Sequence, residues 1–89
     1  MKAFNVKIFL MKESCGISYW VAFQREDGKY ITPYRFNELY KALHEAIIFS
    51  QFFGLPECVV EPNEDFGLTQ EMIDEAYKDA RFGIFTQKY

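Results

Sequence analysis

Residues 17–34 read ISYWVAFQREDGKYITPY, and this stretch decides the fold. Its first eight residues place large apolar side chains at every second position, which is the period of a half-buried strand. The dipeptide Asp27-Gly28 is a strong signal for a two-residue hairpin turn, and residues 29–34 continue as the next strand. Pro33 cannot donate a backbone hydrogen bond, so it predicts an edge strand or a strand end.

The same alternation occurs before this stretch. Residues 4–11 place Phe, Val, Ile and Leu on one face, and residues 12–16 form a turn. The chain therefore opens with a predicted three-stranded antiparallel meander. Four apolar residues are expected on the sheet face that points away from the core, which makes that face a sticky surface if it is open to solvent. These residues are Phe9, Met11, Trp20 and Ile31.

The hydrophobic pattern then changes to the helical period. Asn37 is predicted to cap a helix that ends near Phe53, because Gly54 and Pro56 follow. The C-terminal half of this helix is apolar on every side, so we expect a second helix or a second subunit to cover it. The predicted stripe comprises Leu39, Tyr40, Leu43, Ala46, Ile47 and Ser50.

A short apolar run and a second helix complete the predicted fold. Residues 57–61 are β-branched and lie between two prolines, which favours a fourth short strand without establishing it. Thr69 is predicted to cap a helix over residues 70–82 that Gly83 ends, and residues 84–89 form a tail that docks as a strand or lies free.

We therefore expect one α+β domain over residues 1–89, in the order βββα(β)α, with two helices on one face of the sheet. The predicted core consists of Val6, Ile8, Leu10, Tyr19, Val21, Phe23, Tyr40, Leu43, Ile47, Met72, Ile73 and Ala76.

The charges divide unevenly along the chain. Residues 57–75 contain seven carboxylates and no Lys or Arg. Residues 1–56 have a net charge of +2 and residues 57–89 a net charge of −5. A field of this kind attracts basic partners and repels nucleic acid and anionic membranes.

Motifs for catalysis or cofactor binding are missing from the sequence. His44 is the single histidine and is interpreted as a surface or half-buried helix residue. Cys15 and Cys58 lack metal-ligand spacing and indicate free thiols in a reducing, cytoplasmic setting. The glycines are scattered, so no phosphate-binding loop is predicted, and no stretch is apolar for the length of a membrane span. We expect no enzyme activity, no metal and no cofactor.

The charge split leads to a functional hypothesis. We interpret the chain as a small inhibitor or adaptor whose acidic half docks on a basic protein, such as a nuclease or another nucleic-acid-binding protein. Its carboxylates would imitate the phosphates of DNA, as in decoys used by phages and mobile elements. The predicted contact residues are Glu57, Glu61, Glu64, Asp65, Glu71, Asp74, Glu75 and Asp79. The simpler interpretation is that these residues only keep the protein soluble.

Two other hypotheses remain open. Basic and aromatic residues in the meander are typical of surfaces that stack single-stranded nucleic acid, although the acidic half opposes direct binding. A purely structural role through the aromatic surface is the second.

Seventeen aromatic residues in 89 also favour a homodimer, because so small a domain has few buried places for them. The predicted dimer contacts are either Ile48, Phe49, Phe52 and Phe53 at the end of the first helix, or Trp20 and its neighbours on the sheet.

Overall fold

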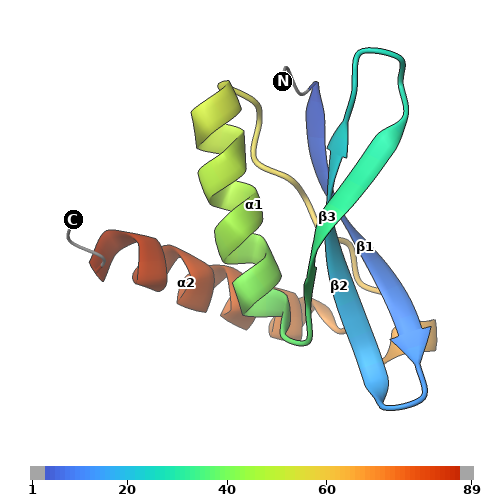
Figure 1. Ribbon diagram of the computed structural model, residues 1–89. Coiled ribbons are helices and arrows are strands. Elements are labelled where there is room, and N and C mark those ends of the chain that lie inside the picture. The colour runs from blue at the N-terminus through green and yellow to red at the C-terminus, as the bar shows by residue number, and fades with distance from the viewer. Residues whose placement is uncertain (1–3, 87–89) are drawn as a thin grey trace.

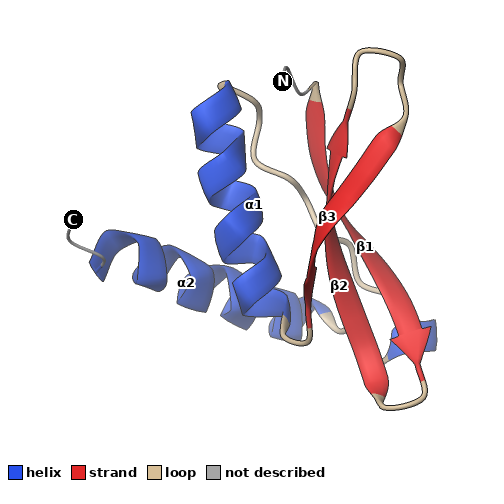
Figure 2. Cartoon of the chain, viewed as in Figure 1, coloured by secondary structure: helices blue, strands red, loops and turns tan. Residues whose placement is uncertain are grey.

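The computed structural model describes residues 4–86, with side chains described through Gly83. It contains three strands, β1 (Asn5–Glu13), β2 (Gly16–Gln24) and β3 (Tyr30–Phe36). They form one antiparallel sheet in the order β1-β2-β3. The helix α1 (Leu39–Phe53), the 3₁₀ turn η1 (Glu64–Phe66) and the helix α2 (Gln70–Thr86) follow (Figures 1 and 2). The predicted α+β fold with an N-terminal meander is therefore confirmed.

The register of the sheet gives each face a distinct character. Val6 pairs with Phe23 across β1 and β2, and paired residues share a face, so the alternating apolar residues of both strands meet on the inner side. Between β2 and β3 the register shifts, because Phe23 pairs with Ile31 whereas Val21 pairs with Tyr34. This β-bulge includes Pro33, which lies on an edge strand as predicted.

Ile31 lies on the opposite side of the sheet from the one predicted. It pairs with Phe23 and packs against the hydrophobic core. The face on which Ile31 lies is set by its pairing with Phe23 on β2. Alternation within β3 does not reveal this pairing, so the β-bulge explains the wrong prediction only in part.

The helices stack on one side of the sheet (Figure 1). α1 contacts all three strands, and α2 packs mainly across α1 rather than on the sheet. The core is thus formed where α1 lies between the sheet and α2. Its buried apolar residues are Val6, Tyr19, Val21, Phe23, Leu39, Ala42, Leu43, Ala46, Ile47, Cys58, Val60, Leu68, Ile73, Ala76 and Ala80.

Most of the predicted core residues are buried, and four are not. Ile8 and Leu10 are half-buried and pack against the core. Tyr40 is 39% exposed and Met72 is 50% exposed, so their assignment to the core was wrong. Both belong to the correct helix stripes, but α1 and α2 diverge at this point and leave an open groove.

The ends of α1 show how local signals act. Glu38, with extended backbone angles, is the N-cap and makes no side-chain cap hydrogen bond, so the predicted capping by Asn37 was wrong. Gly54 ends the helix in the left-handed region at φ 67°, as predicted. The sheet, rather than a second helix, covers one side of the apolar end of α1: the Phe49 ring lies 4.8 Å from Phe23 and 5.5 Å from Tyr34, measured between ring centroids. The other side stays open, since Phe52 is 79% exposed.

Residues 57–61 do not form the fourth strand left open by the sequence. Cys58 and Val60 point into the core, while Val59 is 82% exposed. The segment is held by α2, because the Tyr77 hydroxyl donates a hydrogen bond to the Cys58 carbonyl oxygen at 2.5 Å. A hollow of about 450 Å³, lined by Ile8 among others, separates it from β1.

α2 begins as predicted and continues further than predicted. The Met72 N–H donates to the Thr69 hydroxyl oxygen at 3.2 Å, which is the expected N-cap hydrogen bond. The helix passes through Gly83, so the predicted stop at that residue was wrong. Gly83 lies beside the His44 ring, which a Cβ at this position would meet at 3.4 Å. Residues 84–86 are helical rather than a strand, and residues 87–89 of the predicted tail lie outside the described residues.

Candidate protein-binding groove

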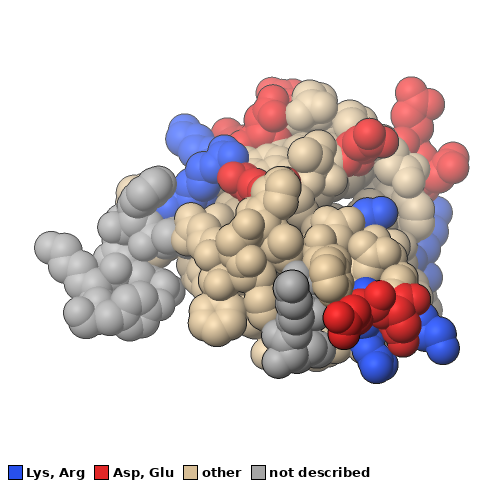
Figure 3. Space-filling view, turned by 90° about the horizontal axis from the view of Figure 1, so that it is seen from above, with Lys and Arg blue, Asp and Glu red and all other residues tan. Residues whose placement is uncertain are grey.

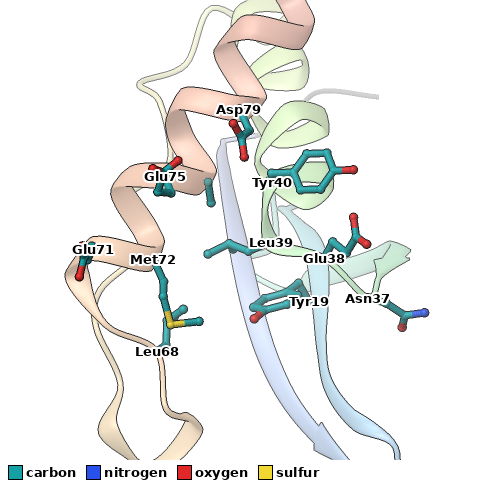
Figure 4. A pocket seen from close by; sticks show the side chains of 11 residues that line it. Tyr19, Asn37, Glu38, Leu39, Tyr40, Leu68, Glu71, Met72, Glu75 and Asp79 are labelled. Carbon is teal, nitrogen blue, oxygen red and sulfur yellow. The ribbon is translucent and has the colours of Figure 1, made fainter.

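A groove opens between the start of α1 and the N-terminal half of α2 (Figure 4). Its volume is about 510 Å³. The β2 strand contributes to its floor, and the chain just before each helix contributes to its ends. The lining residues are Tyr19, Asn37, Glu38, Leu39, Tyr40, Leu68, Glu71, Met72, Glu75, Ala76 and Asp79.

The floor of this groove is apolar. Leu39, Leu68 and Ala76 are buried within it, and Figure 4 shows Leu39 extending from α1 toward α2. Met72 and Tyr40 are half exposed at its mouth, where they can contact a partner. Such a floor binds apolar side chains through removal of their surface from water.

The rim of the groove is acidic. Glu71, Glu75 and Asp79 repeat every fourth residue, so they lie on one face of α2. Glu38 adds a fourth carboxylate from the start of α1, and none of the described Lys and Arg residues lines the groove. Lys41 approaches Glu38 at 3.7 Å, but both side chains are more than half exposed, so this ion pair contributes little.

The two tyrosines of the groove stay uncharged at neutral pH. The hydrogen bond with Glu38 raises the pKa of the Tyr40 phenol, with further contributions from desolvation and from the charges of Glu38 and Asp79. Burial raises the pKa of the Tyr19 phenol. The groove therefore combines an uncharged floor with an anionic rim.

The fold separates the eight predicted acidic contact residues into two sets, although all of them are exposed. Glu71, Asp74, Glu75 and Asp79 lie together on α2. Three of them line the groove, and Asp74 accepts a hydrogen bond from the Gln70 amide at 2.9 Å. We call this set the α2 acidic row.

The second set lies on the connection between the helices, close to basic residues. It comprises Glu57, Glu61, Glu64 and Asp65. Glu57 pairs with Arg81 at 2.7 Å. The Lys12 ammonium group donates to the Asp65 carbonyl oxygen at 3.5 Å. The uniformly acidic segment of the sequence therefore has cations beside it in the fold.

A view from above shows the same mixed distribution (Figure 3). Acidic side chains gather along one margin, basic and acidic side chains mix at a corner, and uncharged residues fill the centre of this face. The α2 acidic row is thus one part of the predicted acidic face rather than the whole of it.

Sequence reasoning missed the groove floor and Glu38. The missing information is the divergence of α1 from α2, which no local pattern reveals. Met72 was one usable signal of an apolar surface beside the carboxylates. It is a large apolar residue between Glu71 and Glu75, at the edge of the helix stripe.

The two alternative sets of predicted dimer contacts lie on different elements, one on the sheet and one at the end of α1. Trp20 lies on the sheet face away from the helices, since it pairs with Phe9. Phe49 and Phe53 pack against the core. Ile48 is half-buried, and Phe52 is 79% exposed at the end of α1.

The reactive groups are dispersed. Over the described residues, no three His, Cys, Asp or Glu side chains are grouped to hold a metal ion. Burial raises the pKa of the Cys58 thiol to about 11, so this cysteine is a neutral core residue at pH 7. The His44 Nε2 atom is buried and has no hydrogen-bond partner among the residues whose side chains are described. Within the described part of the chain, neither helix has the combination of length and apolar character that crossing a membrane requires.

Models of known protein families give no match to this chain, and comparisons with curated proteins and with solved structures give none either.

Proposed function

We propose that this protein is a non-catalytic binding protein whose acidic groove docks on a basic segment of another protein. The observation that carries the proposal is the α2 acidic row beside an apolar floor. Among residues 4–83, four carboxylates and no cations line the groove, so a segment rich in Lys or Arg is the complementary ligand. The apolar floor adds affinity that charge alone does not provide.

The regular spacing of the row supports a nucleic-acid-binding protein as the partner class. Glu71, Glu75 and Asp79 repeat about every 6 Å along the helix axis. A phosphate backbone also presents a regular row of negative charge, and proteins bind it with Lys and Arg. Occupation of such a basic surface would make the protein an inhibitor or a decoy.

Matched charge reversals test this proposal. One variant carries Glu71→Lys, Glu75→Lys and Asp79→Lys in the groove. Its control carries Glu26→Lys, Asp27→Lys and Glu45→Lys, which make the same change in net charge outside the groove and outside the eight predicted contact residues.

We expect the tagged wild type to capture a basic protein from a lysate of its natural host at low salt and to release it as salt rises. The control variant should retain this partner and the groove variant should lose it. A nucleic-acid ligand of the captured protein should compete with the wild type for binding. Equal retention by both variants would show that the groove carboxylates are only a solvated surface.

A further inference from the structure

The two edges of the sheet differ in how open they are to a further strand. β3, at one edge, contains Pro33 and takes part in the β-bulge, and both features interrupt backbone pairing. β1, at the other edge, has nine residues without proline or glycine and pairs with β2 in unbroken register. β1 is therefore the edge that can accept another strand.

The outward backbone groups of β1 lack a partner strand. In an antiparallel ladder, every second residue turns its N–H and C=O away from the neighbouring strand. Over residues 4–86, no backbone hydrogen bond joins β1 to a segment other than β2. A row of donors and acceptors is left along this edge, and such a row is a template for an extended chain.

The hollow beside β1 runs along this edge, and we call it the β1 slot. Lys7, Ile8 and Leu10 line one wall, and residues 59–63 line the other. Val6 is 1% exposed on the same face of β1, whereas Ile8 and Leu10 are half-buried. The slot therefore leaves two apolar side chains incompletely covered.

The size of the β1 slot matches a short strand. A strand rises about 3.3 Å per residue and lies about 4.8 Å from its neighbour, and stacked sheets are about 10 Å apart. Three residues of strand therefore occupy about 480 Å³. The slot has a volume of about 450 Å³, and residues 8–10 of β1 cover the same length.

Lysine side chains on edge strands often prevent pairing with another chain, but those of β1 leave the slot open. The Lys7 ammonium group lies 5.4 Å from the centroid of the Tyr30 ring on β3, so its charge extends across the sheet and away from the edge. The Lys12 ammonium group donates to the Asp65 carbonyl oxygen, and Lys12 does not line the slot. With Lys7 and Glu61 in its lining, the slot has no net charge, so it suits an uncharged segment.

The faces of the sheet determine which side chains an added strand needs. A residue beside Ile8 or Leu10 would point to the side of the core and should be apolar, with β-branched residues favoured. A residue beside Phe9 would point to the opposite, solvent-exposed face and can be polar. The matching segment is therefore uncharged and alternates apolar and polar residues.

Two occupants from this chain itself do not fit. Residues 57–61 are held as the far wall of the slot, because Cys58 and Val60 are buried in the core and the Tyr77 hydroxyl donates to the Cys58 carbonyl oxygen. The β1 edge of a second copy continues into its own sheet, and residues 59–63 close the slot against anything wider than a single extended segment.

We propose that the β1 slot binds an extended, uncharged segment of a partner protein, which joins the sheet as a fourth strand antiparallel to β1. Antiparallel pairing is slightly more stable per residue than parallel pairing. Backbone hydrogen bonds and alternating apolar side chains provide the recognition. The slot and the acidic groove share no lining residue, so this site is separate from the one that binds basic segments.

Hydrogen exchange measured by NMR on the full chain tests the proposal with the peptide acetyl-Thr-Val-Thr-Val-Thr-amide. In the free protein, every second amide of β1 should exchange rapidly. The peptide, at a concentration of about ten times its dissociation constant, should slow these amides about tenfold. Rapid exchange that the peptide leaves unchanged overturns the proposal. Slow exchange of all β1 amides in the free protein also overturns it, since residues 57–61 would then already pair with β1.

A second peptide separates strand pairing from apolar adsorption. It has the same side chains, but its three central amide nitrogens are methylated, so it cannot donate to the β1 carbonyl groups along either edge. This peptide should bind at least tenfold more weakly than the first. Equal binding of the two peptides would mean that backbone pairing is not involved and would contradict the proposal.

Two variants at highly exposed apolar residues locate the site. Val59 is 82% exposed and lines the slot, whereas Phe52 is 79% exposed and does not. Val59→Ala removes two methyl groups from the wall and should weaken peptide binding roughly three- to tenfold. Phe52→Ala should leave binding unchanged. Equal affinities of the two variants would place the peptide elsewhere and overturn the proposal.

The triple groove variant Glu71→Lys/Glu75→Lys/Asp79→Lys makes this test independent of the proposed function. It should bind the Thr-Val peptide as tightly as the wild type does, because none of its substitutions lies in the slot. Loss of peptide binding in this variant, or slowed exchange in β3 rather than in β1, would show that the peptide binds outside the slot and that the proposal is wrong.

Discussion

The Tyr77 hydroxyl and the Cys58 carbonyl oxygen form a hydrogen bond of 2.5 Å that joins α2 to the extended segment after α1. This bond anchors residues that have no strand partner. Desolvation raises the pKa of Tyr77, so its hydroxyl remains a donor at neutral pH.

We expect Tyr77→Phe to reduce the free energy of unfolding by about 1 kcal/mol, because it removes the donor and leaves the half-buried ring in place. Urea denaturation at pH 7 measures the change. Tyr34→Phe is the control, since this ring stacks on Phe49 and is 42% exposed, and its loss of a hydroxyl should cost less. Equal effects of the two substitutions would mean that the Tyr77 hydrogen bond does not anchor the segment.

The buried Cys58 thiol predicts a loss of stability at alkaline pH. Its pKa is raised from 9.0 to about 11 in the folded state, mainly by burial. Because this pKa is higher in the folded state, the Cys58 thiol loses its proton at a lower pH in the unfolded chain than in the folded protein. The stabilising contribution is therefore complete below pH 9 and is lost as the pH rises toward 11.

Two pKa units correspond to roughly 2–3 kcal/mol in the free energy of unfolding. The raised pKa values of Tyr19 and Tyr77 change the stability in the same direction. Urea midpoints at several pH values between about 8 and 11 provide the test. Cys58→Ala should be less stable than the wild type at pH 7, yet lose less stability as the pH rises. Parallel curves for the two proteins would contradict the assignment of this effect to Cys58.

Two glycine substitutions should have opposite effects. Gly83 lies within α2, and an added Cβ would meet the His44 ring at 3.4 Å, an ordinary contact. Gly83→Ala should therefore stabilise the protein by about 0.5–1 kcal/mol. Gly54 has φ 67°, which disfavours alanine, so Gly54→Ala should destabilise by about 1 kcal/mol. Thermal unfolding of both variants is the measurement, and destabilisation by Gly83→Ala would indicate that α2 does not continue through this residue.

Several features of the fold could be predicted from local signals. These features depend on residues that are close together in the sequence. They are the alternation over β1 and β2, the end of α1 at Gly54 and the N-cap at Thr69. Gly83 shows the limit of such signals, since its packing against His44 depends on a residue far away in sequence.

Features that depend on distant residues were missed. Residues 57–61 have strand-like composition, but pairing also requires a neighbouring strand edge, and contact with α2 holds the segment elsewhere. Helical periodicity placed Tyr40 and Met72 on the correct stripes without revealing that the two helices diverge there. The acidic row was therefore predicted from the sequence, whereas the apolar floor beside it was not.

The α2 acidic row should lower the stability of the protein that carries it. Glu75 lies four residues from both Glu71 and Asp79, and like charges at this spacing repel each other on a helix. Natural sequences keep such local conflicts mainly where function requires them. We expect Glu75→Lys to raise the melting temperature by roughly 2–5 °C, because two repulsions become attractions while one attraction, to Lys78, becomes a repulsion.

The same substitution should weaken capture of the basic partner, since it places a cation in the groove rim. Glu26→Lys is the control for net charge, because Glu26 is exposed on the β2–β3 turn and does not line the groove. Thermal unfolding at low and high salt completes the test, since salt should raise the melting temperature of the wild type more than that of Glu75→Lys. If Glu75→Lys leaves stability unchanged at low salt and still captures the partner, repulsion within the row is negligible and the row is not a binding surface.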